Sequence, residues 1–294
     1  MSLLRRYKAL GESFNPNEIE LRQSLRVNTL KISKKDLIKR LKKKNVKLEK
    51  IDFLDNGYYY EAKFSLGSTQ EYLQGYYYLQ EAASQLPVQV LNPVSGDLVL
   101  DMAAAPGSKS TQISQMMKNK GILVAVESNI SRTKSLINNL ERLSVTNVLV
   151  YKKDSRFIQD FNVEFDKILL DAPCSGNFCV EKDFFKKRTP HDFKIKANTQ
   201  KELLKAAIKC LKKGGTLVYS TCSLEPEENE LVIQWFIEKY PEMKLVDTGI
   251  KIGEPGLTEI FKKSLSKDIE KTRRFWPHKT GTEGFFIAKL KKND

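Results

Sequence analysis

The chain has 294 residues and carries 50 Lys and Arg against 36 Asp and Glu, a formal net charge of +14. Its 40% hydrophobic content, without any apolar run near the roughly 18 residues of a membrane span, indicates a soluble protein of one or two domains. Four scattered cysteines and an N-terminus without a signal-peptide core predict a cytoplasmic protein without disulfides or membrane contact. The charge favours a polyanionic partner, although a lysine-rich composition alone would also produce it.

Residues 1–75 are expected to form a small α+β domain. Residues 25–33 alternate like a strand, Ser33 then caps a helix over 34–45, and further strand-like runs follow on both sides of the turn at 55–57. The lysines on the outer face of that helix suit RNA phosphates, and nearby tyrosines suit base stacking. A lid domain whose lysines are merely solvated is the alternative interpretation.

Residues 76–294 are expected to form a second, larger domain, in which the pattern changes to repeated strand–helix units from Asp97. Buried strands are expected at 98–101, 122–126, 148–151, 165–170, 216–219 and 284–290. Helices are expected at 106–117, 131–143, 200–211 and 226–238. This alternation predicts an α/β fold with a doubly wound, mostly parallel sheet. Residues 178–199 and 249–283 are expected to be long irregular loops that shape a site.

The turn after the first of these strands has the features of a ligand site. Small residues between Asp101 and Lys109 let the backbone approach a ligand closely, but the spacing fits neither a pyrophosphate fingerprint nor a P-loop. A smaller adenosine ligand with an amino-acid tail fits better. Glu127 at the end of the next strand could bind both ribose hydroxyls, and Asp154 after the third could accept from the adenine amino group.

Two cysteines follow the ends of neighbouring strands. Cys174 comes after Asp171 at the end of 165–170, and Cys222 follows 216–219. Because carboxyl ends of adjacent parallel strands meet at one edge, both thiols should face one pocket. No Cys-x-x-Cys pair and only two histidines occur, so we expect no metal site. Cys210, beside a helix end, fits an inert core thiol.

The chain resembles the RNA 5-methylcytosine methyltransferases of the Sun (nucleolar-protein/Sun) family over about residues 24–290. The resemblance rests on Arg26-Val-Asn28, Gln80-to-Ser84, Asp101-to-Lys109, Asp171-Ala-Pro-Cys174-Ser-Gly176, Ser220-to-Glu230, Arg274-to-His278 and Gly284-Phe-Phe. It implies a Rossmann-like class I methyltransferase that uses S-adenosylmethionine and acts on RNA. The cofactor-binding residues it implies are Ala103, Ala104, Ala105, Pro106, Gly107, Ser108, Lys109, Glu127, Arg132, Asp154 and Asp171. After Gly176 the chain departs from the family pattern, because Asn177-Phe-Cys-Val-Glu replaces the usual glycine and arginine.

By resemblance, Cys222 is the nucleophile that attacks carbon 6 of cytosine, and Cys174 assists release of the product. Asp171 would hydrogen-bond the ring nitrogen, and Lys109 would favour the thiolate. The base must be single-stranded or flipped out to be reached. In DNA cytosine-5 methyltransferases the Pro-Cys thiol attacks instead, so the choice between the thiols rests on the resemblance.

The motifs do not encode the substrate RNA. A compact chain without a further RNA-binding domain favours tRNA, in the manner of an archaeal-type tRNA enzyme, and leaves rRNA as the alternative. A catalytically silent RNA-binding or assembly protein on a methyltransferase fold is a rival of another class. The intact Asp171, Cys174 and Cys222 count against it, and the Thr-Cys motif counts against a DNA methyltransferase.

Overall fold

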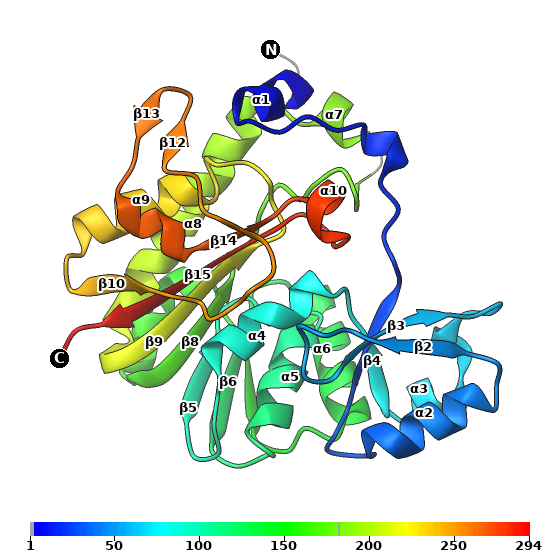
Figure 1. Cartoon of the computed structure of the whole chain (residues 1–294). Coiled ribbons are helices and arrows are strands. Elements are labelled where there is room, and N and C mark those ends of the chain that lie inside the picture. The colour runs from blue at the N-terminus through cyan, green and yellow to red at the C-terminus, as the bar shows by residue number, and fades with distance from the viewer. Residues whose placement is uncertain (1–2, 182) are drawn as a thin grey trace.

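The computed structural model describes residues 3–181 and 183–294, and consists of a small antiparallel sheet beside a large mixed sheet (Figure 1). The small sheet has the order β2-β3-β1-β4. Its strands are β1 (Ser24–Val27), β2 (Lys47–Lys50), β3 (Gly57–Glu61) and β4 (Tyr77–Leu79). Helix α2 (Lys34–Lys42) packs Leu37 and Leu41 against the sheet, and the expected cap is present because Ser33 Oγ accepts from the Asp36 amide.

The large sheet has the order β11-β14-β15-β9-β8-β5-β6-β7, with β10 also paired to β15. Strands β9, β8, β5, β6 and β7 run parallel, whereas β15 runs antiparallel to β9. This confirms the predicted doubly wound, mostly parallel sheet. The strands are β5 (Leu98–Asp101), β6 (Ile122–Glu127), β7 (Val148–Lys152), β8 (Phe165–Asp171), β9 (Leu211–Thr221), β10 (Met243–Val246), β11 (Glu254–Pro255), β14 (Arg273–Phe275) and β15 (Phe285–Lys292).

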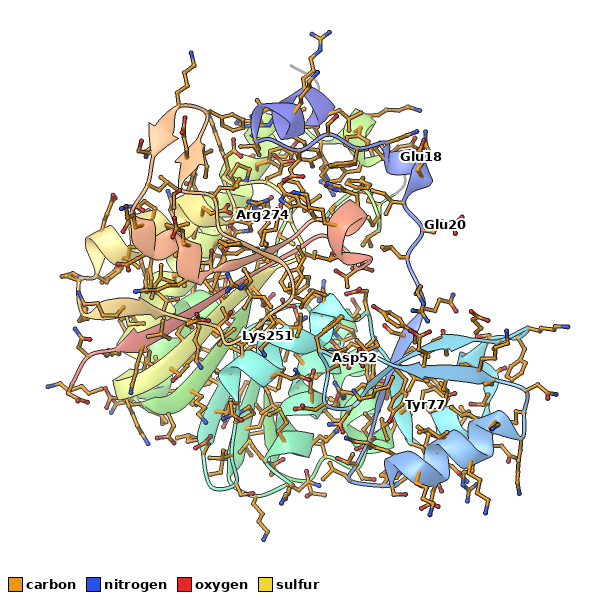
Figure 2. The ribbon with its side chains drawn as sticks, viewed as in Figure 1. Glu18, Glu20, Asp52, Tyr77, Lys251 and Arg274 are labelled. Carbon is orange, nitrogen blue, oxygen red and sulfur yellow. The ribbon has the colours of Figure 1, made fainter. Side chains whose placement is uncertain are left out.

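Helices cover both faces of the large sheet. One face packs against α4 (Leu86–Leu91), α5 (Ser108–Met116) and α6 (Ile130–Arg142), and the other against α8 (Pro190–Lys209), α9 (Glu230–Lys239) and η4 (Ser155–Phe161). Each sheet buries large side chains completely, as Tyr77 in the small one and Arg274 in the large one illustrate (Figure 2). No helix in the described ranges is both long and apolar enough to cross a bilayer.

The segment expected to be an irregular loop, residues 178–199, is largely helical, so that prediction was wrong. It contains α7 (Phe184–Lys187) and the first half of α8, which begins at Pro190 after a capping box between Thr189 and Asp192. The first half of α8 is mostly polar and has only a narrow apolar face, since Phe193 and Ala197 are its only buried residues. Residues 249–283 also hold short elements, namely β12 (Glu259–Ile260), β13 (Lys263–Ser264), η5 (Lys267–Lys271) and α10 (Pro277–Thr280).

Helix α1 (Leu3–Ala9) lies against the large domain and not against the small sheet (Figure 1). Leu3 packs with Phe184 and Phe193, and Tyr7 packs with Trp276. An extended segment with one short turn, η1 (Pro16–Glu18), then leads to β1. The boundary expected at residue 75 stays a prediction, although β4 carries the small sheet as far as Leu79 and η2 (Leu66–Ser68) and α3 (Gln70–Leu73) precede it.

Candidate active site

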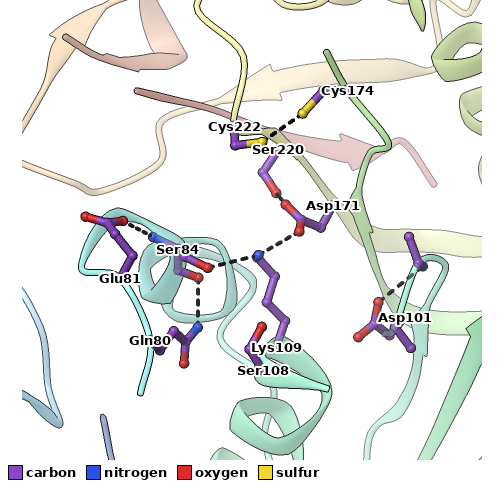
Figure 3. A network of polar contacts seen from close by, with 12 residues as sticks. Gln80, Glu81, Ser84, Asp101, Ser108, Lys109, Asp171, Cys174, Ser220 and Cys222 are labelled. Carbon is purple, nitrogen blue, oxygen red and sulfur yellow. Dashed lines mark hydrogen bonds and ion pairs between the residues drawn. The ribbon is translucent and has the colours of Figure 1, made fainter. Parts of the chain in front are cut away.

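The two cysteines meet where two parallel strands end. In the pairing of β8 with β9, Asp171 stands opposite Ser220, so the residues that follow emerge side by side. The Sγ atoms of Cys174 and Cys222 lie 2.9 Å apart, and both side chains are half-buried (Figure 3). The structure thus brings both thiols to one point, as neighbouring strand ends predict.

A lysine–aspartate pair lies beside the thiols. The Nζ atom of Lys109 is 2.6 Å from Asp171 Oδ2, and Ser220 Oγ donates to Asp171 Oδ1 at 2.7 Å. Lys109, in the first turn of α5, is only 7% exposed, and its Nζ also donates to Ser84 Oγ at 3.1 Å. Three segments that are distant in sequence therefore fix one ammonium group next to the thiols (Figure 3).

The surroundings of Cys222 disfavour its thiolate form unless a positive charge lies nearby. The hydrogen bond with Cys174, burial, and the charge of Asp171 all raise the pKa of Cys222 well above its ordinary value. The charge of Lys109 acts in the opposite direction and lowers it. Deprotonation of this thiol consequently depends on where the Lys109 ammonium is held.

Glu228 joins the loops that follow the two thiols, a role that the sequence did not suggest. This completely buried carboxylate accepts from the Ser175 amide at 3.0 Å and from Ser223 Oγ at 2.9 Å. Ser175 Oγ and Gln200 Nε2 also donate to it. Acids in the first turn of a predicted helix usually face solvent, so only the folded structure reveals that burial raises the pKa of this one.

A cleft of about 290 Å³ opens next to the thiols, with Pro173 in its wall. Four of the predicted cofactor residues line it, namely Ala103, Glu127, Arg132 and Asp154. The Glu127 carboxylate accepts from the Asn129 amide at 2.8 Å through Oε1, and its Oε2 is 3.5 Å from the Arg132 guanidinium. Carboxylates at the ends of two successive strands, with apolar walls from Met102 and Leu203, suit an adenosine group.

Asp154 already has a partner within its own turn. Arg156 is 2.6 Å from the carboxylate, and their hydrogen bond lowers the pKa of Asp154. A base amino group would therefore approach an ionised carboxylate that is shared with a guanidinium. Arg132, which also lines the cleft, donates to the Ala105 carbonyl at 2.6 Å.

The other predicted cofactor residues do not line the cleft, and most of them form the turn between β5 and α5. Ala104 and Ala105 are buried, and Gly107 ends the turn at a φ of 104°, in the left-handed region that favours glycine. The remaining residues of this group are Pro106, Ser108, Lys109 and Asp171, the last two of which form the pair beside the thiols. Burial raises the pKa of Asp101, at the start of the turn, to about 6.

Two glutamates near Lys109 went unnoticed in the sequence. The Glu81 carboxylate accepts from the amides of Ser84 and Glu283, each at 3.1 Å, and so ties the turn before α4 to the start of β15. Burial and the neighbouring Glu81 raise the pKa of the Glu283 carboxyl to about 7, against the effect of Lys109. Although Glu81 lies in the Gln80-to-Ser84 motif, 202 positions separate it from Glu283, so the sequence does not indicate their contact.

Both parts of the chain match models of known protein families. Residues 88–291 match the family model for 16S rRNA methyltransferase RsmB/F, and residues 3–82 match that for the N-terminal domain of 16S rRNA methyltransferase RsmF. A solved methyltransferase homologue from Pyrococcus horikoshii is 43% identical, with a TM-score of 0.85 over 98% of this chain and 90% of that chain. NSun6 from the same organism is 31% identical with a TM-score of 0.85, over 95% and 93%.

Similar curated proteins carry both rRNA and tRNA names. The 25S rRNA (cytosine-C(5))-methyltransferase nop2 of Schizosaccharomyces pombe is 41% identical over 96% of this chain and 48% of its own length. The tRNA (cytosine(72)-C(5))-methyltransferase of Pyrococcus horikoshii is 41% identical over 78% and 57%. The chain spans about half the length of these relatives. Since the first family model covers most of the chain, this protein belongs to the RsmB/F (NOP2/Sun) family of S-adenosylmethionine-dependent methyltransferases.

Proposed function

We propose that the protein methylates carbon 5 of a cytosine in RNA, with S-adenosylmethionine as the methyl donor. The observation that carries this proposal is the pair of thiols 2.9 Å apart, beside the Lys109–Asp171 pair and next to a cleft suited to adenosine. The names of relatives that act on cytosine carbon 5 in rRNA and in tRNA support the same reaction.

The chemistry requires a covalent step, because carbon 5 of cytosine is a poor nucleophile. The Cys222 thiolate adds to carbon 6 and forms the S–C6 bond, and the displaced ring electrons move toward the ring nitrogen, which takes up a proton. The Lys109–Asp171 pair would hydrogen-bond at that nitrogen and supply the proton. The base must leave its helical stack for this attack.

Carbon 5, now enamine-like, takes the methyl group that the bound donor supplies as an electrophile. The proton on carbon 5 then has to leave, its bonding electrons re-form the C5–C6 double bond, and the thiolate of Cys222 departs. Cys174 is suitably close to assist this release, since its Sγ is 2.9 Å from that of Cys222.

The position of Lys109 supports Cys222 as the attacking thiol, because its charge lowers the pKa of that thiol. If this assignment holds, Cys174→Ala protein should accumulate a covalent adduct with RNA that survives a denaturing gel. Cys222→Ala protein should form none. The opposite pattern would transfer the nucleophilic role to Cys174.

Two RNA classes are candidate substrates. Both family models and the fission-yeast relative carry rRNA names, whereas the archaeal relative carries a tRNA name. Bisulfite sequencing of total RNA from cells with and without the protein tests both, because a cytosine protected only in its presence identifies the RNA and the position. No protected cytosine in either class would contradict the proposed activity.

A further inference from the structure

Arg26 of the small domain reaches into the methyltransferase domain beside the candidate active site. Its Nη1 donates to the Ser108 carbonyl at 2.7 Å and to Gln80 Oε1 at 2.6 Å, and its Nη2 donates to Thr111 Oγ1 at 2.8 Å. Ser108 immediately precedes Lys109 and is the first residue of α5. A strand of one domain thus holds the first turn of the helix that carries the catalytic lysine.

Burial of the Arg26 guanidinium by itself lowers the stability of the fold. Arg26 is 1% exposed, and no carboxylate among the described residues pairs with its guanidinium. Burial lowers the pKa of Arg26 to about 9. Burying a charge that only neutral oxygens compensate is expensive, and an apolar side chain of similar size would suffice to pack two domains together.

A continuous path of hydrogen bonds runs from Arg26 to the catalytic groups. Gln80 accepts from Arg26 and donates through Nε2 to the Ser84 carbonyl at 3.1 Å. Ser84 Oγ in turn accepts from Lys109 Nζ, which pairs with Asp171 (Figure 3). Arg26 therefore acts on Lys109 from two sides, through the backbone at Ser108 and through Gln80 and Ser84.

We propose that Arg26 and Gln80 are positioning residues of the methyltransferase reaction, by which the small domain sets the place of the Lys109 ammonium. Neither residue touches the reacting atoms. They act through Lys109, whose distance from Cys222 decides how readily that thiol is deprotonated. The inference rests on the proposed attack by Cys222, and holds for either RNA class.

The test compares kcat, KM and the pH profile of variants on one RNA substrate. In Arg26→Lys and Gln80→Met proteins we expect kcat to fall about tenfold or more, with the KM for RNA within a few-fold of the parent value. The rising limb of kcat against pH should move to higher pH, because a displaced ammonium lowers the thiol pKa less. Ser84→Ala, which removes a single hydroxyl from Lys109, should shift the limb in the same direction.

Asn28→Ala is the matched control. Asn28 is also a buried residue of the small domain that bonds to the other domain, but its Nδ2 donates to the carbonyls of Gly75 and Leu143, away from Lys109. It should change thermal stability without moving the pH profile. If Arg26→Lys and Gln80→Met behave like Asn28→Ala, or if Ser84→Ala leaves the profile of a folded protein unchanged, the positioning role is rejected. A parent protein that methylates no RNA at any pH would contradict the proposed function instead.

Discussion

The ammonium group of Lys109 serves two oxygen partners at once, and both interactions are short and lie in a buried setting. Asp171 balances its charge at 2.6 Å, while Ser84 holds it at 3.1 Å. Because Ser220 occupies the other oxygen of Asp171, the carboxylate cannot easily turn toward either thiol. Asp171 thus balances the charge of Lys109, in addition to its proposed part in protonating the ring nitrogen, whereas Lys109 favours the thiolate of Cys222.

Replacing Asp171 with Asn should reduce kcat by about 100-fold or more, because the size and one hydrogen-bond acceptor are kept while the amide can no longer take part in protonating the ring nitrogen. Methyl transfer from labelled donor measures the decrease. Asp166→Asn, at the other end of β8 and paired with Lys212, should retain full activity. Equal activities of the two variants would contradict the role given to Asp171.

Glu283→Gln tests whether the raised pKa of Glu283 lowers the stability of the protein as the pH increases. The pKa of Glu283 is about 7 in the folded protein, above the unfolded value, so ionisation disfavours the folded state and the parent protein loses stability as pH rises through 5 to 7. The glutamine variant avoids this loss. The free energy of unfolding of the variant relative to that of the parent should therefore be about 1–3 kcal/mol greater at pH 8 than at pH 5. Urea unfolding at both pH values measures this difference. A constant difference across that range would show that the carboxyl titrates normally.

At the scale of elements, β14 and α9 are joined by an ion pair that is completely buried. The Arg274 guanidinium contacts the Glu230 carboxylate in two places, and its Nη1 also donates to the Leu224 carbonyl at 2.6 Å. Leu224 follows Cys222 by two residues, so this pair supports the loop behind the thiol as well as the sheet edge.

Removing one partner should be far more costly than removing both. Arg274→Met should destabilise the protein by about 3–5 kcal/mol, because Glu230 stays buried without its counter-charge. The double variant Arg274→Met with Glu230→Met should recover part of that loss. Glu254→Gln, which breaks an exposed pair with Lys279, should cost less than about 1 kcal/mol. Calorimetric melting of the four proteins measures the differences.

The sequence was most informative where structure is determined locally. Buried apolar runs that end in Asp101, Glu127 and Asp171 are short and distinctive, so strand ends and the edge that collects the site could be predicted. The start of α8 at Pro190 could not, because its apolar face is narrow and its capping box lies in a charged stretch. The packing of α1 could not be predicted from the sequence either, since its partners lie far along the chain.

The same limit applies to the site. Cys174, Cys222, Asp171 and Lys109 are marked by motifs, and the structure brings them together, although their roles stay predictions. Glu228 and Glu81 lie within motifs, but their contacts, like those of Glu283, form only in the tertiary structure, so no local pattern indicates them. Four of the expected cofactor residues line the cleft, whereas most of the others form the turn between β5 and α5.

For the whole molecule, the net charge of +14 predicts salt-sensitive RNA binding. Cations concentrate along α2 and its flanks, where a groove of about 590 Å³ is lined by Lys31, Lys39, Arg40, Lys43 and Lys44. In Lys39→Gln with Lys43→Gln protein, RNA affinity should fall. The slope of log K against log salt should become shallower by about 0.7–0.9 for each phosphate that the variant no longer neutralises.

Fluorescence anisotropy over a range of salt concentrations measures that slope. Lys244→Gln with Lys291→Gln is the control of equal charge change, since both exposed residues lie on β10 and β15, at the opposite end of the molecule from α2 (Figure 1). If the two double variants show the same decrease in affinity and slope, RNA senses only the overall charge, and the small domain has no special part in docking.

The packing of α1 on the large domain also sets an order of events during synthesis. The helix leaves the ribosome well before Phe193 and Trp276, which bury Leu3 and Tyr7 and come much later in the chain. At roughly 5–20 residues per second, α1 waits about 15–55 s for its binding surface. A seven-residue helix is not stable alone, so this segment stays unfolded while the small sheet forms behind it. The docking of α1 is thus a late step of folding, in which this helix packs against the segment that follows Cys174.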